Sequence, residues 1–227
     1  MTEKSSPSLE FSEKYTPEHA EEYFRKHQAG FWRQLSNRRE IVIARKALKM
    51  AGTPASVLDL PSGTGRFWEM LCEQPERKIT AADNSHNMFE VGMQLRPKDV
   101  TRRIETFQCS AFDIPLPDNA VENIFCMRLL HHIGKNEDRL ALFREFRRVA
   151  SQTVCISLWV DGNYKAYKRR RVEATRGDRK AYQNRFVLPR SQVEAEFREA
   201  GMEIIGHVDF LKHYSMWRIY VLGTAGS

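Results

Sequence analysis

Cysteine is scarce in this 227-residue sequence, and none of its four cysteines belongs to a Cys-x-x-Cys pair. A zinc site would need paired ligands that are absent here, and each cysteine lies in an apolar context, so we predict free, buried thiols and no metal site. Long apolar runs are also missing, since no segment approaches the roughly 18 residues that a membrane span requires. The amino terminus is polar and lacks the apolar centre of a secretory signal. These absences predict a cytoplasmic protein without a transmembrane segment.

Acidic residues are scarce in one stretch of the chain. Residues 165–190 contain ten Lys or Arg and two acids, whereas the whole chain has a net charge of +7. The rest of the chain is therefore close to neutral, and this one segment is a candidate contact surface for an anionic ligand. The alternative is a solvated helix whose charged side chains are exposed to water and bind no ligand. Aromatic residues lie between the basic ones, so contact with RNA is a further alternative.

Strand-like and helix-like segments alternate through most of the chain. Such alternation predicts a mainly parallel sheet with helices on both faces, a Rossmann-like α/β fold. Helices are expected before the sheet, from Pro17 and from about Trp32 to Met50. Ser191 and Glu194 predict a capping box for a late helix. Seven strands are expected, within residues 56–60, 78–83, 104–109, 121–127, 153–160, 202–211 and 217–223, and the last two are predicted to form an antiparallel pair at a sheet edge.

The segment VLDLPSGTGRF, residues 57–67, reads as a strand that ends in a glycine-rich turn and restarts as a helix. Gly63 and Gly65 suit such a turn, because a Cβ would block close approach of a ligand or a positive φ. Asp59 at the strand end can accept hydrogen bonds from an ammonium group or from loop amides. Asp83 ends the next strand, where a carboxylate can accept from both ribose hydroxyls.

The third glycine of a dinucleotide site is missing, because Trp68 occupies its place. That glycine permits close helix–strand packing around a pyrophosphate, so Trp68 argues against a nicotinamide cofactor. The glycine turn instead resembles the first motif of class I S-adenosylmethionine (SAM)-dependent methyltransferases. ITAADNSHNMFEVG resembles their second motif, and QCSAFDIPLPDNAVENIFCMRLLHHI and EAEFREAGMEII are similar to later segments of the small-molecule group called type 11. The match runs from about residue 55 to 205.

The resemblance implies a SAM site built from several segments of the chain. The glycine turn would hold the methionine part, Asp83 would bind the ribose, and the segment around Asp113 would contact the adenine. Backbone carbonyls after the fourth strand would face the methionine part. The implied cofactor-binding residues are Asp59, Pro61, Ser62, Gly63, Thr64, Gly65, Asp83, Asn84, Met88, Ala111, Phe112, Asp113, Cys126 and Met127.

Pro61 departs from the family pattern, in which the first residue of the turn is glycine. Proline restricts φ to within about 15° of −65° and has no N–H that could donate to a cofactor. The turn is therefore expected to be stiffer than in the family, with Gly63 and Gly65 still available.

Methyl transfer from a sulfonium needs positioning in a dry pocket, and it needs a base only if the acceptor must lose a proton. His131 and His132 follow the fourth strand and are the candidate catalytic bases, with hydrogen bonding to the loop backbone as the structural alternative. In similar enzymes the region that is basic here covers the acceptor. The candidate substrate residues of this lid are Tyr164, Tyr167, Lys168 and Arg185.

The predicted organisation has two parts. Residues 1–52 would form a tail and covering helices, and residues 53–227 the SAM-binding methyltransferase domain, with a basic lid insertion at about 161–190. The expected function is methyl transfer from SAM to a small or lipid-linked, anionic acceptor. An RNA methyltransferase and a non-catalytic SAM-fold partner protein remain alternatives.

Overall fold

A computed structural model describes residues 30–176 and 185–224. The helix predicted from Pro17 and the middle of the basic segment, 177–184, lie outside these residues. The elements are α2 (Phe31–Met50), β1 (Ser56–Asp59), α3 (Trp68–Leu71), β2 (Lys78–Asp83), α4 (His86–Leu95), α5 (Lys98–Thr101), β3 (Ile104–Gln108), β4 (Val121–Cys126), the 3₁₀ helix η2 (Leu130–His132), α6 (Asn136–Val149), β5 (Ala150–Trp159), α7 (Tyr164–Arg176), α8 (Arg190–Glu199), β6 (Glu203–Asp209) and β7 (Trp217–Gly223).

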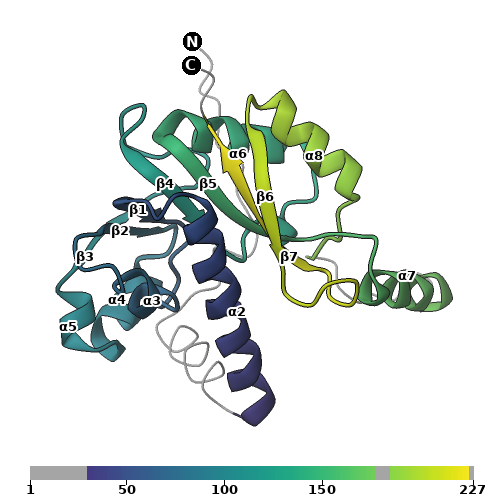
Figure 1. The fold of residues 1–227 in the computed structure, drawn as a ribbon, viewed down its shortest axis with the longest axis horizontal. Helices are drawn as coiled ribbons and strands as arrows, with labels where there is room; N and C mark the ends of the chain where they lie inside the picture. Colours follow the sequence, from purple (N-terminus) through teal and green to yellow (C-terminus); the bar gives the residue numbers. More distant parts are fainter. Residues whose placement is uncertain (1–29, 177–184, 225–227) are drawn as a thin grey trace.

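The seven strands form one sheet in the order β3-β2-β1-β4-β5-β7-β6 (Figure 1). The first five strands are parallel, and β7 runs antiparallel to both β5 and β6. The predicted mainly parallel, seven-stranded sheet with an antiparallel pair at one edge is therefore confirmed. The last strand of the chain lies inside the sheet, and β6 forms the edge.

Two apolar cores cover the two faces of the sheet. Side chains of α6 and α8, including Phe143, Phe146 and Phe197, pack on one face. Side chains of α2, α3, α4 and α5 pack on the other face, with Trp68 at the centre of that layer. Helices on both faces explain why the inner strands are apolar on both sides rather than alternating.

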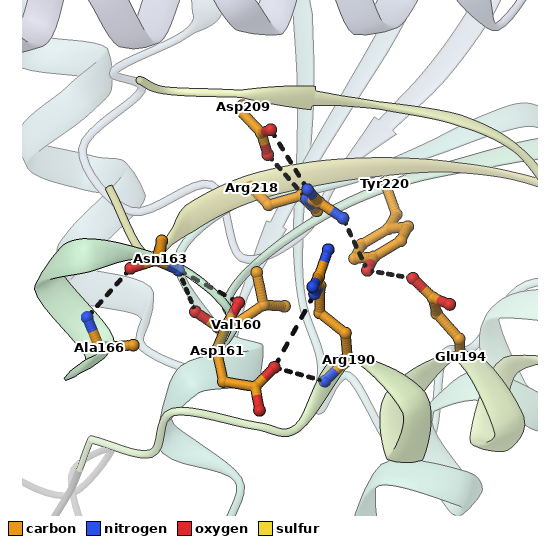
Figure 2. Close-up of polar contacts among 9 residues, drawn as sticks. All are labelled: Val160, Asp161, Asn163, Ala166, Arg190, Glu194, Asp209, Arg218 and Tyr220. Carbon is orange, nitrogen blue, oxygen red and sulfur yellow. Dashed lines mark hydrogen bonds and ion pairs between the residues drawn. The ribbon is translucent and has the colours of Figure 1, made fainter. Parts of the chain in front are cut away.

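The capping box predicted at Ser191 is wrong. Helix α8 begins at Arg190, one residue earlier, and Pro189 occupies the N-cap position. The Arg190 amide instead donates to the Asp161 carboxylate at 3.0 Å, so a distant side chain does the capping (Figure 2). Glu194 accepts a hydrogen bond from the Tyr220 hydroxyl at 2.8 Å, which ties α8 to β7. A contact with the neighbouring strand has thus replaced the local motif.

Helices α6 and α8 are joined by a buried ion pair between Arg139 and Glu196, whose side chains are 1% and 4% exposed. Its two hydrogen bonds measure 2.7 and 2.5 Å. We expect Glu196→Gln to destabilise the protein by about 3–5 kcal/mol, because it leaves the buried guanidinium without its counter-charge. Urea unfolding followed by circular dichroism measures the change.

The matched control is Glu199→Gln, which breaks the exposed Arg144–Glu199 pair between the same two helices. Exposed ion pairs contribute little to stability, so this substitution should lower the free energy of unfolding by no more than about 1 kcal/mol. Equal losses in the two variants would contradict the importance of the buried pair.

Candidate active site

The ends of β1, β2, β4 and β5 meet at one edge of the sheet, because these strands are parallel. Their last residues are Asp59, Asp83, Cys126 and Trp159. The chain order reverses between β1 and β4, where ligands of open α/β sheets bind outside the carboxyl ends of the strands. The predicted cofactor residues therefore converge at the position where the fold favours a ligand.

The glycine turn is hydrogen-bonded directly to the end of β2. The Gly63 amide donates to Asp83 Oδ2 at 2.9 Å, and the Ser85 amide donates to Asp83 Oδ1 at 3.0 Å. Gly63 and Gly65 have φ values of +54° and +68°, in the left-handed region that favours glycine. Burial raises the pKa of the Asp83 carboxyl, and the donating amides oppose that rise. A carboxylate has about four acceptor positions, so two amides leave it able to bind hydroxyl groups.

Asp59 carries a buried carboxylate without a hydrogen-bond partner among the described residues. Burial raises the pKa of this carboxyl well above its usual range, and the nearby Asp83 charge adds to the rise. The Trp68 indole N–H is close enough to oppose the rise but does not reach hydrogen-bonding geometry. The Ser62 hydroxyl is likewise buried and unpartnered within the described chain. Buried polar groups are normally satisfied, so these atoms fit a polar, cationic ligand group such as an ammonium.

Trp68 explains why the turn contains Gly65. A Cβ on Gly65 would lie 2.4 Å from the indole ring, which is too close for any side chain. A Cβ on Gly92 of α4 would lie 3.0 Å from the same ring and 3.0 Å from the Thr64 backbone. The tryptophan that replaces the third glycine thus fills the space between the turn and α4.

The other predicted cofactor residues surround this turn. Met88 is buried on α4, 3.5 Å from where a Cβ of Gly63 would lie. Ala111, Phe112 and Asp113 form a turn beside the end of β2, in which the Phe112 amide donates to the Ser110 hydroxyl at 3.2 Å. Cys126 and Met127 are buried at the end of β4, Asn84 is exposed after β2, and Pro61 follows a cis peptide bond. Which of these residues touch the cofactor stays a prediction.

Glu40 on α2 joins two parts of the site and was missed by the sequence analysis. Its carboxylate lies 3.0 Å from Arg66, directly after the glycine turn, and 3.1 Å from Arg128, directly after the β4 exit. Arg128 has a positive φ of 67°, and its amide donates to the Ser157 hydroxyl at 2.7 Å. Nothing in the sequence signals this contact, because the three charged residues lie far apart along the chain.

The two candidate bases differ in their surroundings. His131 is buried and stacked on Trp159 at a centroid distance of 4.9 Å, with Trp217 at 5.3 Å on an edge. Burial lowers the pKa of His131 to about 2, and neighbouring cations contribute to the fall. His131 is therefore neutral at physiological pH and is a weak base. His132 is half-buried beside it, with a ring separation of 4.1 Å.

Helix α7 has an inner and an outer face. On the inner face, Arg169 lies 5.4 Å above the Trp159 ring. Arg185, which lies beyond the end of the helix, is 5.9 Å from the same ring. The predicted substrate residues Tyr164, Tyr167 and Lys168 lie on the exposed outer face. Arg169 is thus the inner residue that the sequence analysis did not select, because helix phase is ambiguous in a run of three arginines.

The turn before α7 is fixed by polar contacts (Figure 2). Asn163 Oδ1 accepts from the Ala166 amide at 3.0 Å and so caps the helix, and its Nδ2 donates to the Val160 carbonyl at 2.7 Å. Arg218 pairs with Asp209 at 2.7 Å on the neighbouring strands. The Asn163 bonds hold the start of α7 beside the end of β5, and the Arg218–Asp209 pair joins β7 to β6.

Comparison with known proteins agrees with this geometry. Residues 57–153 match the family described as a methyltransferase domain. This segment of the chain is therefore a methyltransferase domain. The predicted family, enzyme class and cofactor are thereby confirmed, and the type 11 group is consistent with the match. A search of curated proteins found no match.

Solved structures share the fold of this methyltransferase chain at low sequence identity. Magnesium protoporphyrin IX methyltransferase from Synechocystis, with bound SAH, has a TM-score of 0.72 at 11% identity, over 90% of this chain and 94% of that one. A possible histamine N-methyltransferase from Thermotoga maritima has a TM-score of 0.61 at 13% identity, over 92% and 97%. A Haloferax volcanii complex of a methyltransferase activator and a putative methyltransferase has a TM-score of 0.58 at 12% identity, over 84% and 94%.

None of the described helices is long and apolar enough to cross a membrane. Within the same part of the chain, no group of three or more His, Cys, Asp or Glu side chains is placed to hold a metal ion.

We predict that Glu40→Gln weakens SAM binding by about 1 kcal/mol or more, because Arg66 and Arg128 lose the charge that holds the two loops in place. Calorimetric titration with SAM measures the affinity. The control is Glu73→Gln, which breaks the Arg45–Glu73 pair made by the same helix away from the site. Equal affinities in wild type and Glu40→Gln would show that the ion pairs do not position the site.

Asp59→Asn should stabilise the unliganded methyltransferase, and the gain should grow with pH. The pKa of Asp59 is higher in the folded protein than in the unfolded chain, where it is about 4. The protonated carboxyl therefore costs no stability below that pH, whereas the wild type loses stability as the pH rises from there toward the folded-state pKa. Urea unfolding from about pH 4 to neutral pH measures this trend. Asp118→Asn removes an exposed carboxylate as the control. A gain that is constant with pH would refute the buried-charge explanation.

Proposed function

We propose that this methyltransferase transfers the SAM methyl group to a small or lipid-linked acceptor that carries an anionic group. One observation supports the acceptor class: Arg128, Arg169 and Arg185 gather around Trp159 and Trp217 beside the cofactor residues. All three cations act on the enclosed His131, whose pKa they help to lower. They therefore converge on one place at the strand edge.

The charge balance at this place favours an anion. Glu40 neutralises Arg128, and Glu173 lies 2.6 Å from Arg169. Among the described residues, no acidic side chain pairs with Arg185, which is exposed and near the Trp159 ring. A guanidinium in this setting suits bidentate contact with a carboxylate or phosphate.

The cofactor would be held by the residues around the glycine turn. Asp59 and Ser62 would accept from its ammonium group, because their buried oxygens have no other partner in the described chain. Gly63 and Gly65 would let the turn approach its methionine part, and Asp83 would accept from the ribose hydroxyls. Met88 and the turn from Ala111 to Asp113 would enclose the adenine.

When bound, SAM supplies a methyl carbon activated by the sulfonium sulfur. The protein's contribution is to align the acceptor with that carbon and to exclude water. If the acceptor must lose a proton, His132 is better placed to receive it than His131, since His131 is buried with a pKa near 2. An acceptor with a free lone pair needs neither histidine.

The decisive experiment incubates the purified protein with methyl-labelled SAM and a cell extract, then fractionates the products. Label in small molecules or lipids supports the proposal, and the labelled compound should carry a carboxylate or phosphate. Label in RNA would favour the nucleic-acid alternative. Tight SAM binding without any transfer would favour a non-catalytic partner protein.

We expect Asp83→Ala to weaken SAM binding by about 1–3 kcal/mol, the usual cost of losing hydrogen bonds to a charged group. Calorimetric titration measures the affinity, and circular dichroism checks that the variant is folded. Glu90→Gln, at an exposed position on α4, is the control. Unchanged affinity in a folded Asp83→Ala protein would remove Asp83 from the cofactor site.

A further inference from the structure

The outer face of α7 and the turn between β6 and β7 together expose four large aromatic or apolar side chains. Tyr164 is 52% exposed, Tyr167 59%, Leu211 45% and Tyr214 45%. We call these four residues and the cations between them the α7 face. Large apolar side chains that are exposed singly need no explanation, whereas a cluster on one surface indicates an interaction site.

The α7 face is one continuous surface although it comes from two segments. The Tyr164 amide donates to the His213 carbonyl and the Lys165 amide to the Tyr214 carbonyl, both at 3.0 Å. The Tyr164 and Tyr214 rings stack at 5.6 Å with an interplanar angle of 15°. Helix α7 and the β6–β7 turn therefore lie side by side at the margin of the molecule, as Figure 1 shows.

The charge of the α7 face is strongly positive. Helix α7 carries six Lys or Arg and one acid. That acid, Glu173, pairs with Arg169 of the inner face. Lys165 lies 5.4 Å above the Tyr214 ring, and Arg171 lies 5.8 Å from the Tyr167 ring, so cations and aromatic rings alternate across the surface. Lys212 adds a further exposed cation from the turn.

We infer that the α7 face docks the protein onto an anionic membrane surface. Clusters of four to eight basic residues bind anionic lipids, and each contributes about 1 kcal/mol. Tyrosine rings prefer the headgroup level of a bilayer, where one end of the ring is apolar and the hydroxyl is wet. The cations of the face therefore suit the lipid phosphates, and its tyrosines and Leu211 suit the boundary between headgroups and acyl chains. The docking goes beyond the proposed function, since it does not depend on methyl transfer.

A lipid surface fits the α7 face better than RNA does. Tyr164 and Tyr214 stack on each other, which occupies a ring face of each that a base would otherwise use. Leu211 is aliphatic and offers a base no stacking partner, whereas it can enter the apolar boundary of a bilayer. The inner face, with Arg169 over Trp159, would then lie close to the membrane, where a lipid-linked acceptor resides.

The test is co-sedimentation of the full chain with phosphatidylcholine vesicles, with and without phosphatidylglycerol. We expect binding to the anionic vesicles alone and its loss at high salt. The variant Lys165→Gln/Arg171→Gln/Lys212→Gln should bind them at least about tenfold more weakly, as expected from the loss of three cations near the surface. The variant Leu211→Ser keeps all charges and should also bind more weakly.

The charge-matched control is Lys78→Gln/Lys98→Gln/Arg102→Gln, which removes three exposed cations elsewhere. It should retain vesicle binding. Equal loss in the two triple variants would overturn the inference, since net charge alone would then explain binding. Failure of the wild type to bind anionic vesicles, or binding of single-stranded RNA in their place, would also overturn it. SAM affinity measured on the same samples reports separately on the proposed function.

Discussion

The hydrogen bond from the Gly63 amide to the Asp83 carboxylate is the contact on which the rest of the site depends. It joins the turn after β1 to the end of β2 at 2.9 Å, although the two residues belong to different βα units. The turn can make this bond because Gly63 adopts a positive φ, and it keeps its path because Trp68 fills the space beneath Gly65. Asp83 therefore fixes the path of the turn through a hydrogen bond.

Much of the fold followed from the sequence, because the signals were local or periodic. Alternating apolar segments predicted all seven strands, and α2 ends at Met50 as expected, shortly before Gly52 with its φ of +85°. The position of Asp83 after the second strand likewise followed from chain order alone. Such features depend on neighbours within a few residues, which a single sequence displays.

The features that the sequence analysis missed or predicted wrongly depend on contacts between residues far apart in the chain. The capping box at Ser191 gave way to Asp161, which caps α8 from another loop. Glu40 joins Arg66 and Arg128 across the site, and no spacing rule connects three such positions. The phase of α7 was equally hidden, because a run of cations has no apolar stripe to show which face turns inward.

Helix α7 divides the basic segment into two surfaces with different chemistry. Its inner Arg169 lies over the Trp159 indole at the strand edge, whereas its outer face presents tyrosines and cations to solvent. One short helix, capped by Asn163, therefore contributes both to the proposed acceptor site and to an external surface.

The burial of Cys126 has a chemical consequence. A methyl sulfonium is an alkylating agent, and a thiolate beside it would be consumed by the enzyme's own cofactor. Burial raises the pKa of the Cys126 thiol well above its ordinary value, and the Asp59 charge acts in the same direction. The sulfur at the end of β4 thus stays protonated and unreactive. The same carboxylate that would attract the ammonium end of a bound cofactor thus also disfavours a thiolate at this strand end.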